Sequence, residues 1–239
     1  MKIGKKLTMA YFDLVYNRLY DFTTAKLVPY HRLQRTCIDK LRFDDGDKVL
    51  CAGVGTGNEI IHILGVNNKV SIVGVDCSGT ALKKAYKKAL TWGKEIEVLT
   101  MDIQNLEFTT GSFDKVLCLH VMDFIEDKRK TTAEIIRVLK GGGQFVMTYP
   151  SAKEGVDLGV NLLKDSIRYN TNSGKCIRIF SGLLSILSGG FVYIPLIFRS
   201  GQKSCSRGEL EVIFPELGIA DFQIEDYPVY HDFIVYGRK

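Results

Sequence analysis

The stretch that decides the fold is VLCAGVGTGNE, from Val49 to Glu59. It begins as a short apolar run, which is typical of a buried strand, and continues into a turn that carries Gly53, Gly55 and Gly57. Glycine permits a tight turn and lets the backbone approach a ligand closely, and the helical pattern that follows offers unpaired N–H groups. The stretch therefore predicts a strand–turn–helix unit that favours a negatively charged or carboxylate-bearing ligand.

The glycines follow a GxGxG pattern, whereas dinucleotide-binding folds use GxGxxG. This difference argues against a nicotinamide-dependent oxidoreductase. A tight turn between a strand and a helix can also need glycines for backbone reasons alone, so the assignment depends on what the neighbouring strands carry.

Short apolar runs alternate with helical patterns after residue 47, which predicts a parallel sheet flanked by helices and hence an α/β fold. The predicted strands cover residues 48–52, 71–76, 96–101, 115–119 and 144–149, and residues 221–227 and 232–236 form a closing pair. Helices are predicted near residues 58–64, 79–92 and 128–139. Residues 7–41 also have helical periodicity, interrupted at Pro29.

Acidic residues stand at the ends of two predicted strands. Asp76 ends the second strand, where a carboxylate can accept both hydroxyl protons of a ribose, although it could instead cap the next helix, as Ser78 could. Asp102 directly follows the third strand. It can accept a hydrogen bond from an adenine amine while the N–H of Ile103 reaches a ring nitrogen, or it can simply form a turn.

In their order and spacing, these features resemble the Rossmann-like S-adenosylmethionine-dependent methyltransferases, over about residues 49–150. The matching motifs are CAGVGTG, VDCS, MDIQNL, FDKVLCLHVMDFIED and LKGGGQFVMTYP. The resemblance implies a Rossmann-like seven-stranded sheet with flanking helices, S-adenosyl-L-methionine as cofactor, and methyl transfer as the reaction. The cofactor-binding residues that it implies are Gly53, Gly55, Gly57, Asp76, Cys77, Asp102, Ile103 and Leu119.

The chain departs from the family pattern at one position. Two residues before the first glycine the family usually has an acidic residue, and here Cys51 stands there. The departure bears on how the methionine part of the cofactor is held. A non-catalytic S-adenosylmethionine-binding partner subunit would carry the same motifs, so it stays a rival to an enzyme.

Within this superfamily the chain resembles the ubiquinone and menaquinone biosynthesis methyltransferases and the bacterial phospholipid N-methyltransferases. The resemblance depends on YFDLVYNRLYD near the N-terminus and on an apolar insert between the fifth and sixth strands. It implies an N-terminal helical lid (residues 1–44) on a methyltransferase domain (residues 45–239) with the insert at residues 152–205. The implied acceptor is small and largely apolar, such as a quinone, a lipid or a similar natural product, with a soluble metabolite as the alternative.

The insert contains twenty residues without a charge, from 179 to 198. A membrane-spanning helix would have this length, but Gly189, Gly190 and Pro195 would interrupt it, and a span would separate the closing strands from their sheet. Two other interpretations stay open. The segment is either a buried helical pair or an apolar lid over the active site that contacts a membrane peripherally.

The catalytic candidates are His120, at the exit of the fourth strand, with Tyr16 and Tyr149. The transferred methyl group is expected near His120, which serves either as a base or as a packing and cofactor-contacting residue. Related sequences often carry a Glu-His pair a few residues later, where this chain has Asp123 and Phe124. The tyrosines either contact the acceptor or pack in the core.

The composition of the chain argues against some classes of partner. The chain has 239 residues, with 32 Lys and Arg against 27 Asp and Glu, and this small excess is too dispersed to indicate a nucleic-acid partner. The lysines at positions 83, 84, 87 and 88 are expected to form a solvated helix face. The six cysteines form no CxxC pair or metal-ligand cluster, which favours reduced thiols, no metal and a cytoplasmic location. The sequence indicates no oligomeric state.

Overall fold

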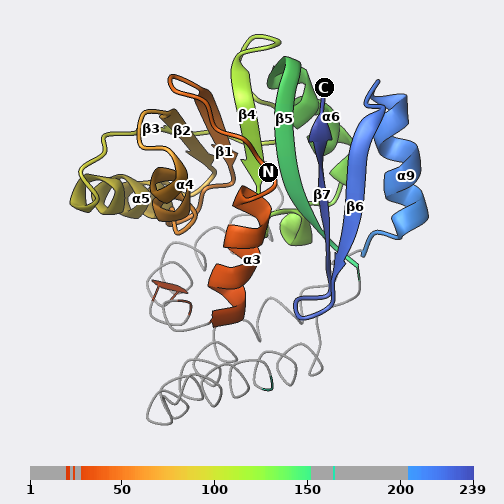
Figure 1. Ribbon diagram of the computed structural model, residues 1–239, viewed down its shortest axis with the longest axis horizontal. Coiled ribbons are helices and arrows are strands. Elements are labelled where there is room, and N and C mark those ends of the chain that lie inside the picture. The colour runs from red at the N-terminus through yellow and green to blue at the C-terminus, as the bar shows by residue number, and fades with distance from the viewer. Residues whose placement is uncertain (1–19, 22–23, 25–27, 152–163, 165–203) are drawn as a thin grey trace, which may run out of the picture.

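The computed structural model describes residues 20, 21, 24, 28–151, 164 and 204–239. Its seven strands form one sheet in the order β3-β2-β1-β4-β5-β7-β6 (Figure 1). The strands are β1 (Lys48–Ala52), β2 (Ser71–Asp76), β3 (Glu97–Thr100), β4 (Phe113–Cys118), β5 (Leu139–Pro150), β6 (Asp221–Tyr227) and β7 (Asp232–Arg238). The helices are α3 (Val28–Ile38), α4 (Ile60–Val66), α5 (Gly79–Thr91), α6 (Lys128–Val138) and α9 (Arg207–Glu216), with a 3-10 turn η2 (Met122–Phe124).

The sheet is parallel from β3 to β5, and β7 runs antiparallel to both of its neighbours. β1 pairs with β2 on one side and with β4 on the other. The chain therefore winds outward from β1 in both directions. The carboxyl ends of β1 and β4 lie side by side at the point where the strand order reverses, and open α/β sheets bind their ligands at that point.

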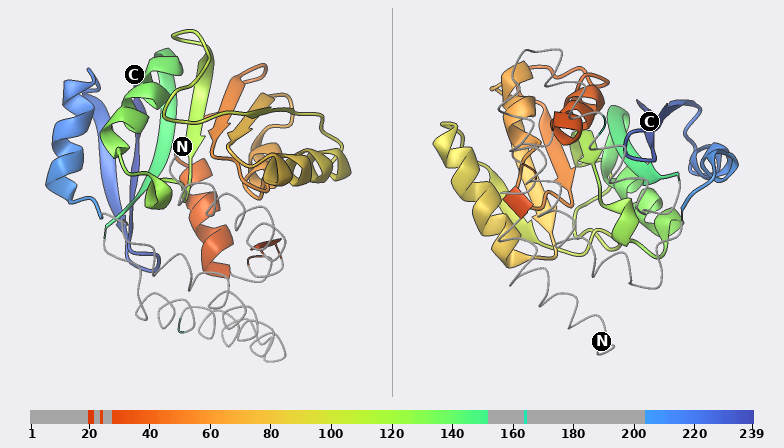
Figure 2. Two further views of the ribbon diagram at one scale, coloured as in Figure 1. Left: turned by 180° about the vertical axis from the view of Figure 1, so that it is seen from behind. Right: turned by 90° about the horizontal axis from the view of Figure 1, so that it is seen from below.

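Helices cover both faces of the sheet, and α3 and α6 lie on opposite faces (Figures 1 and 2). One apolar cluster joins α3, α4 and α5 to the sheet, with Leu33 and Ile63 among its buried residues. The other joins α6 and α9, through Ile135 and Phe214. Successive residues of a strand point to opposite faces, so each central strand contributes to both clusters.

The predicted strands are confirmed, and β1, β2 and β6 have the bounds that were predicted. β5 is longer than predicted, because it begins at Leu139 and continues through Gly141, Gly142 and Gly143 before the apolar run. The helices α4, α5 and α6 lie where periodicity placed them.

The sequence analysis did not predict α9. The helix begins with a capping box, in which the Ser206 hydroxyl accepts from the Glu209 backbone N–H and the Glu209 carboxylate accepts from that of Ser206. It buries only Leu210 and Phe214, and Pro215 lies inside it. Two apolar anchors four residues apart are too few to produce a helical period.

Most of the first 27 residues of the predicted lid, with Tyr16, lie outside the described residues. So does most of the predicted insert, including the uncharged stretch from 179 to 198. In the part of the chain that the structure does describe, no helix has both the length and the apolar character needed to cross a membrane.

Phe214 should anchor α9 to the sheet. Its ring stacks on Phe145 at 5.3 Å and on Phe222 at 5.2 Å, and it is fully buried. We expect Phe214→Ala to lower the free energy of unfolding by about 3–5 kcal/mol, because it leaves a cavity among these rings. Urea unfolding measures the change.

The control is Val212→Ala on the same helix, which should cost no more than about 0.5 kcal/mol because Val212 is 52% exposed. Equal effects of the two substitutions would mean that α9 does not dock on the sheet through Phe214.

Candidate active site

The glycine turn after β1 is tied to the end of β2. The N–H groups of Gly53 and Val54 both donate to the carbonyl of Val75, at 2.8 and 2.9 Å. Gly53, Gly55 and Gly57 all have positive φ, which favours glycine. The turn thus lies at the edge of the sheet formed by the carboxyl ends of the strands, next to the end of β2.

The three glycines differ in how much space a side chain would have at each position. A Cβ on Gly53 would lie 2.4 Å from a methyl carbon of Val121, and one on Gly57 would lie 2.9 Å from the Cβ of Ala85. At Gly55 no described atom lies within 4 Å of that position. Gly53 and Gly57 therefore allow close packing, while Gly55 leaves room for a ligand to approach the backbone.

Asp76 holds the turn from the end of β2. Its Oδ2 accepts from the N–H of Gly55 at 2.9 Å, and its Oδ1 accepts from the N–H of Ser78 at 2.8 Å. The helix cap itself is Ser78, whose hydroxyl accepts from the N–H of Ala81. Burial raises the pKa of Asp76, and the bonds from Ser78 and Gly55 oppose that effect. Cys77 also hydrogen-bonds this carboxylate, through its backbone and its side chain.

The remaining predicted cofactor residues lie at the same edge. The N–H of Met101 donates to the carbonyl of Asp76 at 3.0 Å, which brings the exits of β2 and β3 together. Asp102 is exposed, and its carboxylate accepts from the N–H of Gln104 at 3.0 Å, in a turn. Ile103 is buried, Cys77 is exposed, and Leu119 is partly buried.

His120 lies at the exit of β4, in a left-handed backbone conformation with φ of 56°. Its N–H donates to the Thr148 hydroxyl at 2.8 Å. Its ring stacks on Tyr30 of α3 at 5.4 Å and meets Tyr230 at 5.1 Å. A non-glycine residue with positive φ is uncommon, and such strain concentrates at functional sites.

Of the two interpretations of Tyr149, contact with the acceptor or packing in the core, the structure shows packing in the core. Thr148 faces His120, so the next residue points to the opposite face of β5. The Tyr149 hydroxyl shares a hydrogen bond of 2.7 Å with Thr132 of α6, and its ring packs edge-on against Phe214. Because the side chain is fully buried there, we assign it no role in catalysis.

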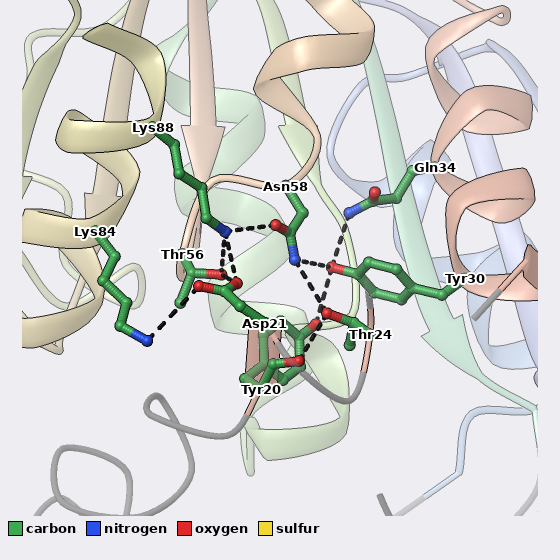
Figure 3. Close-up of polar contacts among 9 residues, drawn as sticks. All are labelled: Tyr20, Asp21, Thr24, Tyr30, Gln34, Thr56, Asn58, Lys84 and Lys88. Atoms are coloured by element: carbon green, nitrogen blue, oxygen red, sulfur yellow. Dashed lines mark hydrogen bonds and ion pairs between the residues drawn. The ribbon is translucent and has the colours of Figure 1, made fainter. Parts of the chain in front are cut away.

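The lysine face of α5 is only partly solvated, and this corrects the sequence analysis. Lys83 and Lys87 are exposed as expected. Lys88 instead donates to Asp21 at 2.5 Å and to the Asn58 amide oxygen at 2.6 Å (Figure 3). Lys84 lies 3.6 Å from Asp21. Lys88 thus joins Asp21 of the N-terminal segment to the glycine turn, and Lys84 adds a second contact between α5 and Asp21.

A second set of polar contacts makes the same connection through α3. The Tyr30 hydroxyl accepts from Tyr20 and from Gln34, each at 2.9 Å, and the Asn58 amide approaches it at 3.4 Å (Figure 3). The Thr56 hydroxyl donates to Asp21 at 2.6 Å. The residues before and within α3 are therefore fastened to the glycine turn by side chains that periodicity does not identify.

Glu59 is a buried carboxyl behind the glycine turn that the sequence analysis did not select. Burial raises its pKa to about 7; Lys88 opposes the shift and Asp76 adds to it. Burial also raises the pKa of Cys51, and Glu59 contributes to that shift. A carboxyl group therefore lies near the position where the family usually carries an acidic residue.

Within the described residues, no three His, Cys, Asp or Glu side chains are grouped to hold a metal ion. The turn, the acidic strand ends and the aromatic pair at His120 together form an edge suited to an organic ligand that carries hydroxyl groups and an apolar part.

Comparison with known proteins identifies the domain. Residues 50–147 match the family described as a methyltransferase domain. The demethylmenaquinone methyltransferase of Thermus thermophilus is 27% identical over 77% of this chain and 78% of that protein. The carboxy-S-adenosyl-L-methionine synthase of Nautilia profundicola is 25% identical over 88% and 92% of the two chains. The phosphatidylethanolamine N-methyltransferase of Cereibacter sphaeroides is 28% identical over 57% of this chain, and the match spans 65% of that relative.

Solved structures share the fold. The magnesium protoporphyrin IX methyltransferase of Synechocystis, which contains bound SAH, has a TM-score of 0.66 at 17% identity and covers 98% of this chain and 99% of its own. A Thermotoga maritima S-adenosylmethionine-dependent methyltransferase has a TM-score of 0.61 at 17% identity, covering 97% and 99%.

Glu59 should make the stability of this domain pH-dependent. Below its unfolded pKa, near 4.5, the group is protonated in both states. Between that value and about 7 the carboxyl group ionises only in the unfolded state. The free energy of unfolding therefore falls by about 3 kcal/mol as pH rises through this range, and it stays level above pH 7. Glu59→Gln should abolish this loss, raising the free energy of unfolding at pH 8 but hardly at pH 4.5.

Chemical denaturation between pH 4.5 and 8 measures the difference. Glu107→Gln is the control, because the Glu107 side chain is exposed. If the free energies of unfolding of Glu59→Gln and of the wild type change with pH in the same way across this range, Glu59 does not keep its proton in the folded protein.

Proposed function

This chain is a Rossmann-like S-adenosylmethionine-dependent methyltransferase, and we propose that it methylates a small, largely apolar acceptor such as a quinone or a lipid. The observation on which the acceptor class rests is the aromatic pair at His120, at the exit of β4. There the rings of Tyr30 and Tyr230 flank His120, where the transferred methyl group is expected. Ring faces bind apolar and aromatic molecules well.

Two further observations support this acceptor class. Relatives of the chain are named for demethylmenaquinone and for phosphatidylethanolamine, which are both lipid-soluble. The twenty uncharged residues from 179 to 198 lie in the insert that follows β5. We retain the division into an N-terminal lid (residues 1–44) and a methyltransferase domain (residues 45–239), in a cytoplasmic protein with peripheral membrane contact.

In this proposal the glycine turn and the strand ends hold the cofactor. The backbone at Gly55 approaches its methionine part, and the Asp76 carboxylate accepts from the ribose hydroxyls beside its bonds to Gly55 and Ser78. Asp102 and Ile103 contact the adenine, with Cys77 and Leu119 beside it. Glu59 supplies a carboxyl near Cys51, where the family's acidic residue is missing.

The protein contributes to methyl transfer mainly by alignment. The sulfonium is already an activated leaving group, so an acceptor held in line with the S–CH₃ bond and kept away from water needs little further help. A base is required only for an acceptor that must lose a proton. His120 and Tyr16 are the proposed contacts on the acceptor side.

Asp76→Ala should weaken S-adenosylmethionine binding by about 1.5–3 kcal/mol, which is roughly 10- to 150-fold in Kd, because charged hydrogen bonds to the ribose are lost. Isothermal titration calorimetry measures the change, and circular dichroism checks that the variant folds. Asp226→Ala is the control, because Asp226 lies exposed on β6. This variant should bind S-adenosylmethionine with the affinity of the wild type. Unchanged affinity in a folded Asp76→Ala protein would rule out the ribose contact.

The acceptor class is tested with methyl-labelled S-adenosylmethionine. The purified protein is incubated with a host cell extract, and the products are partitioned between organic and aqueous phases. We expect label in the organic phase, and much less of it with Asp76→Ala when the cofactor concentration is below the Kd of that variant. Label confined to the aqueous phase would point to a soluble metabolite or a protein. Binding without any transfer would point to a non-catalytic partner subunit.

A further inference from the structure

His120 has a charged neighbour that the motifs do not contain. Its Nδ1 lies 3.6 Å from Oδ2 of Asp232, the first residue of β7, whose side chain is only 4% exposed. The two residues are 112 positions apart, and they meet because β7 inserts beside β5. Among the described residues, the titratable groups in contact with the imidazole are this carboxylate, Tyr30 from α3 and Tyr230 from the β6–β7 hairpin.

The backbone around Asp232 is held firmly. Asp232 pairs with Pro150 on β5 and with Tyr227 on β6. The preceding residue, His231, has a left-handed φ of 52°, and its carbonyl accepts from the N–H of Ser151 at 2.7 Å. The hairpin therefore fixes the direction from which the carboxylate reaches His120.

The other ring nitrogen of His120 is buried without a partner. Nε2 has no hydrogen bond within the described chain. Burial lowers the pKa of His120 to about 4, so the imidazole is neutral near pH 7 and carries a proton on one nitrogen only. A carboxylate facing Nδ1 favours the proton there, which leaves the Nε2 lone pair available as an acceptor.

The ring also lies beside the glycine turn. The residue after His120, Val121, fills the space over Gly53, and Tyr30, stacked on the imidazole, approaches Asn58 of the turn. β1 and β4 are adjacent, so both exits open at the point where the strand order reverses. His120 and Asp232 thus face the site of methyl transfer that the proposed function requires.

We propose that Asp232 is a positioning residue that holds the proton of His120 on Nδ1, so that Nε2 accepts a proton from the acceptor during methyl transfer. This inference rests on the proposed function and narrows it. It selects an acceptor that carries a removable proton, with a hydroxyl group as the simplest case. A carbon or nitrogen that keeps its hydrogens through the reaction would need neither residue.

The step balances for a hydroxyl acceptor. The acceptor oxygen forms a bond to the methyl carbon as the S–CH₃ bond breaks, and that electron pair stays on sulfur, which becomes a neutral thioether. The hydroxyl proton passes to Nε2 of His120 and from there to water. The imidazolium formed in between is stabilised by the Asp232 carboxylate, as in other carboxylate–histidine pairs. Contacts such as the 3.6 Å separation commonly shorten when substrate binds.

The first test reads the tautomer directly. Long-range ¹⁵N–¹H correlation spectra of ¹⁵N-histidine-labelled protein, assigned with His120→Gln, should show the Nδ1–H form at His120. Asp232→Asn should change that tautomer ratio, while Asp226→Asn, on the same hairpin, should not. A predominant Nε2–H form in the wild type overturns the proposal, and this result does not depend on whether any variant folds.

The second test measures transfer and binding together. With the host cell extract as the source of acceptor, Asp232→Asn and His120→Gln should each slow organic-phase labelling at least tenfold, whereas the calorimetric Kd for S-adenosylmethionine stays within about twofold. Labelling by Asp232→Asn at the wild-type rate would overturn the positioning role. If the wild type itself does not bind the cofactor, the proposed function fails instead, and the tautomer measurement still decides the role of Asp232.

Discussion

The pairing of β1 with β4 is the constraint on which the rest of the structure depends. Because these parallel strands are neighbours, the chain must leave β1 toward β2 and later leave β4 toward β5, in opposite directions across the sheet. Their carboxyl ends are therefore not covered by a direct connection between them. The glycine turn follows one strand and His120 follows the other, so the residues proposed for the cofactor and those proposed for the acceptor share one edge.

The N-terminal segment completes this edge through polar contacts rather than apolar packing. Asp21 meets Lys88 and Thr56, and Tyr30 bonds Tyr20 while it stacks on His120. One side chain, Tyr30, thus touches the imidazole with its ring face and the residues around the turn with its hydroxyl. A displacement of α3 would therefore disturb both halves of the proposed site.

The sequence predicted what depends on local pattern and missed what depends on tertiary contacts. The bounds of β1 and β2 followed from short apolar runs, and the position of Asp76 followed from the end of one of them. No local pattern distinguishes Lys88 from Lys87, because only the docked Asp21 makes one of them part of a network. The sequence left Tyr149 open between the acceptor and the core, because the face that it occupies is set by the alternation of β5. Asp232 could not be found at all, because its role depends on a hairpin that returns beside β5.

Electrostatics connects these parts. The chain has a small positive net charge, yet the carboxyl groups of Asp76, Glu59 and Asp232 gather at the edge where we propose that the cationic sulfonium binds. A protonated imidazole there would repel the sulfonium in a poorly hydrated site. The burial that lowers the pKa of His120 keeps it neutral, so the same residue can tolerate the incoming cation and still accept a proton. In the proposed reaction the sulfonium would lose its charge while the imidazole gains one, and the nearby Asp232 carboxylate would stabilise the positive charge on His120.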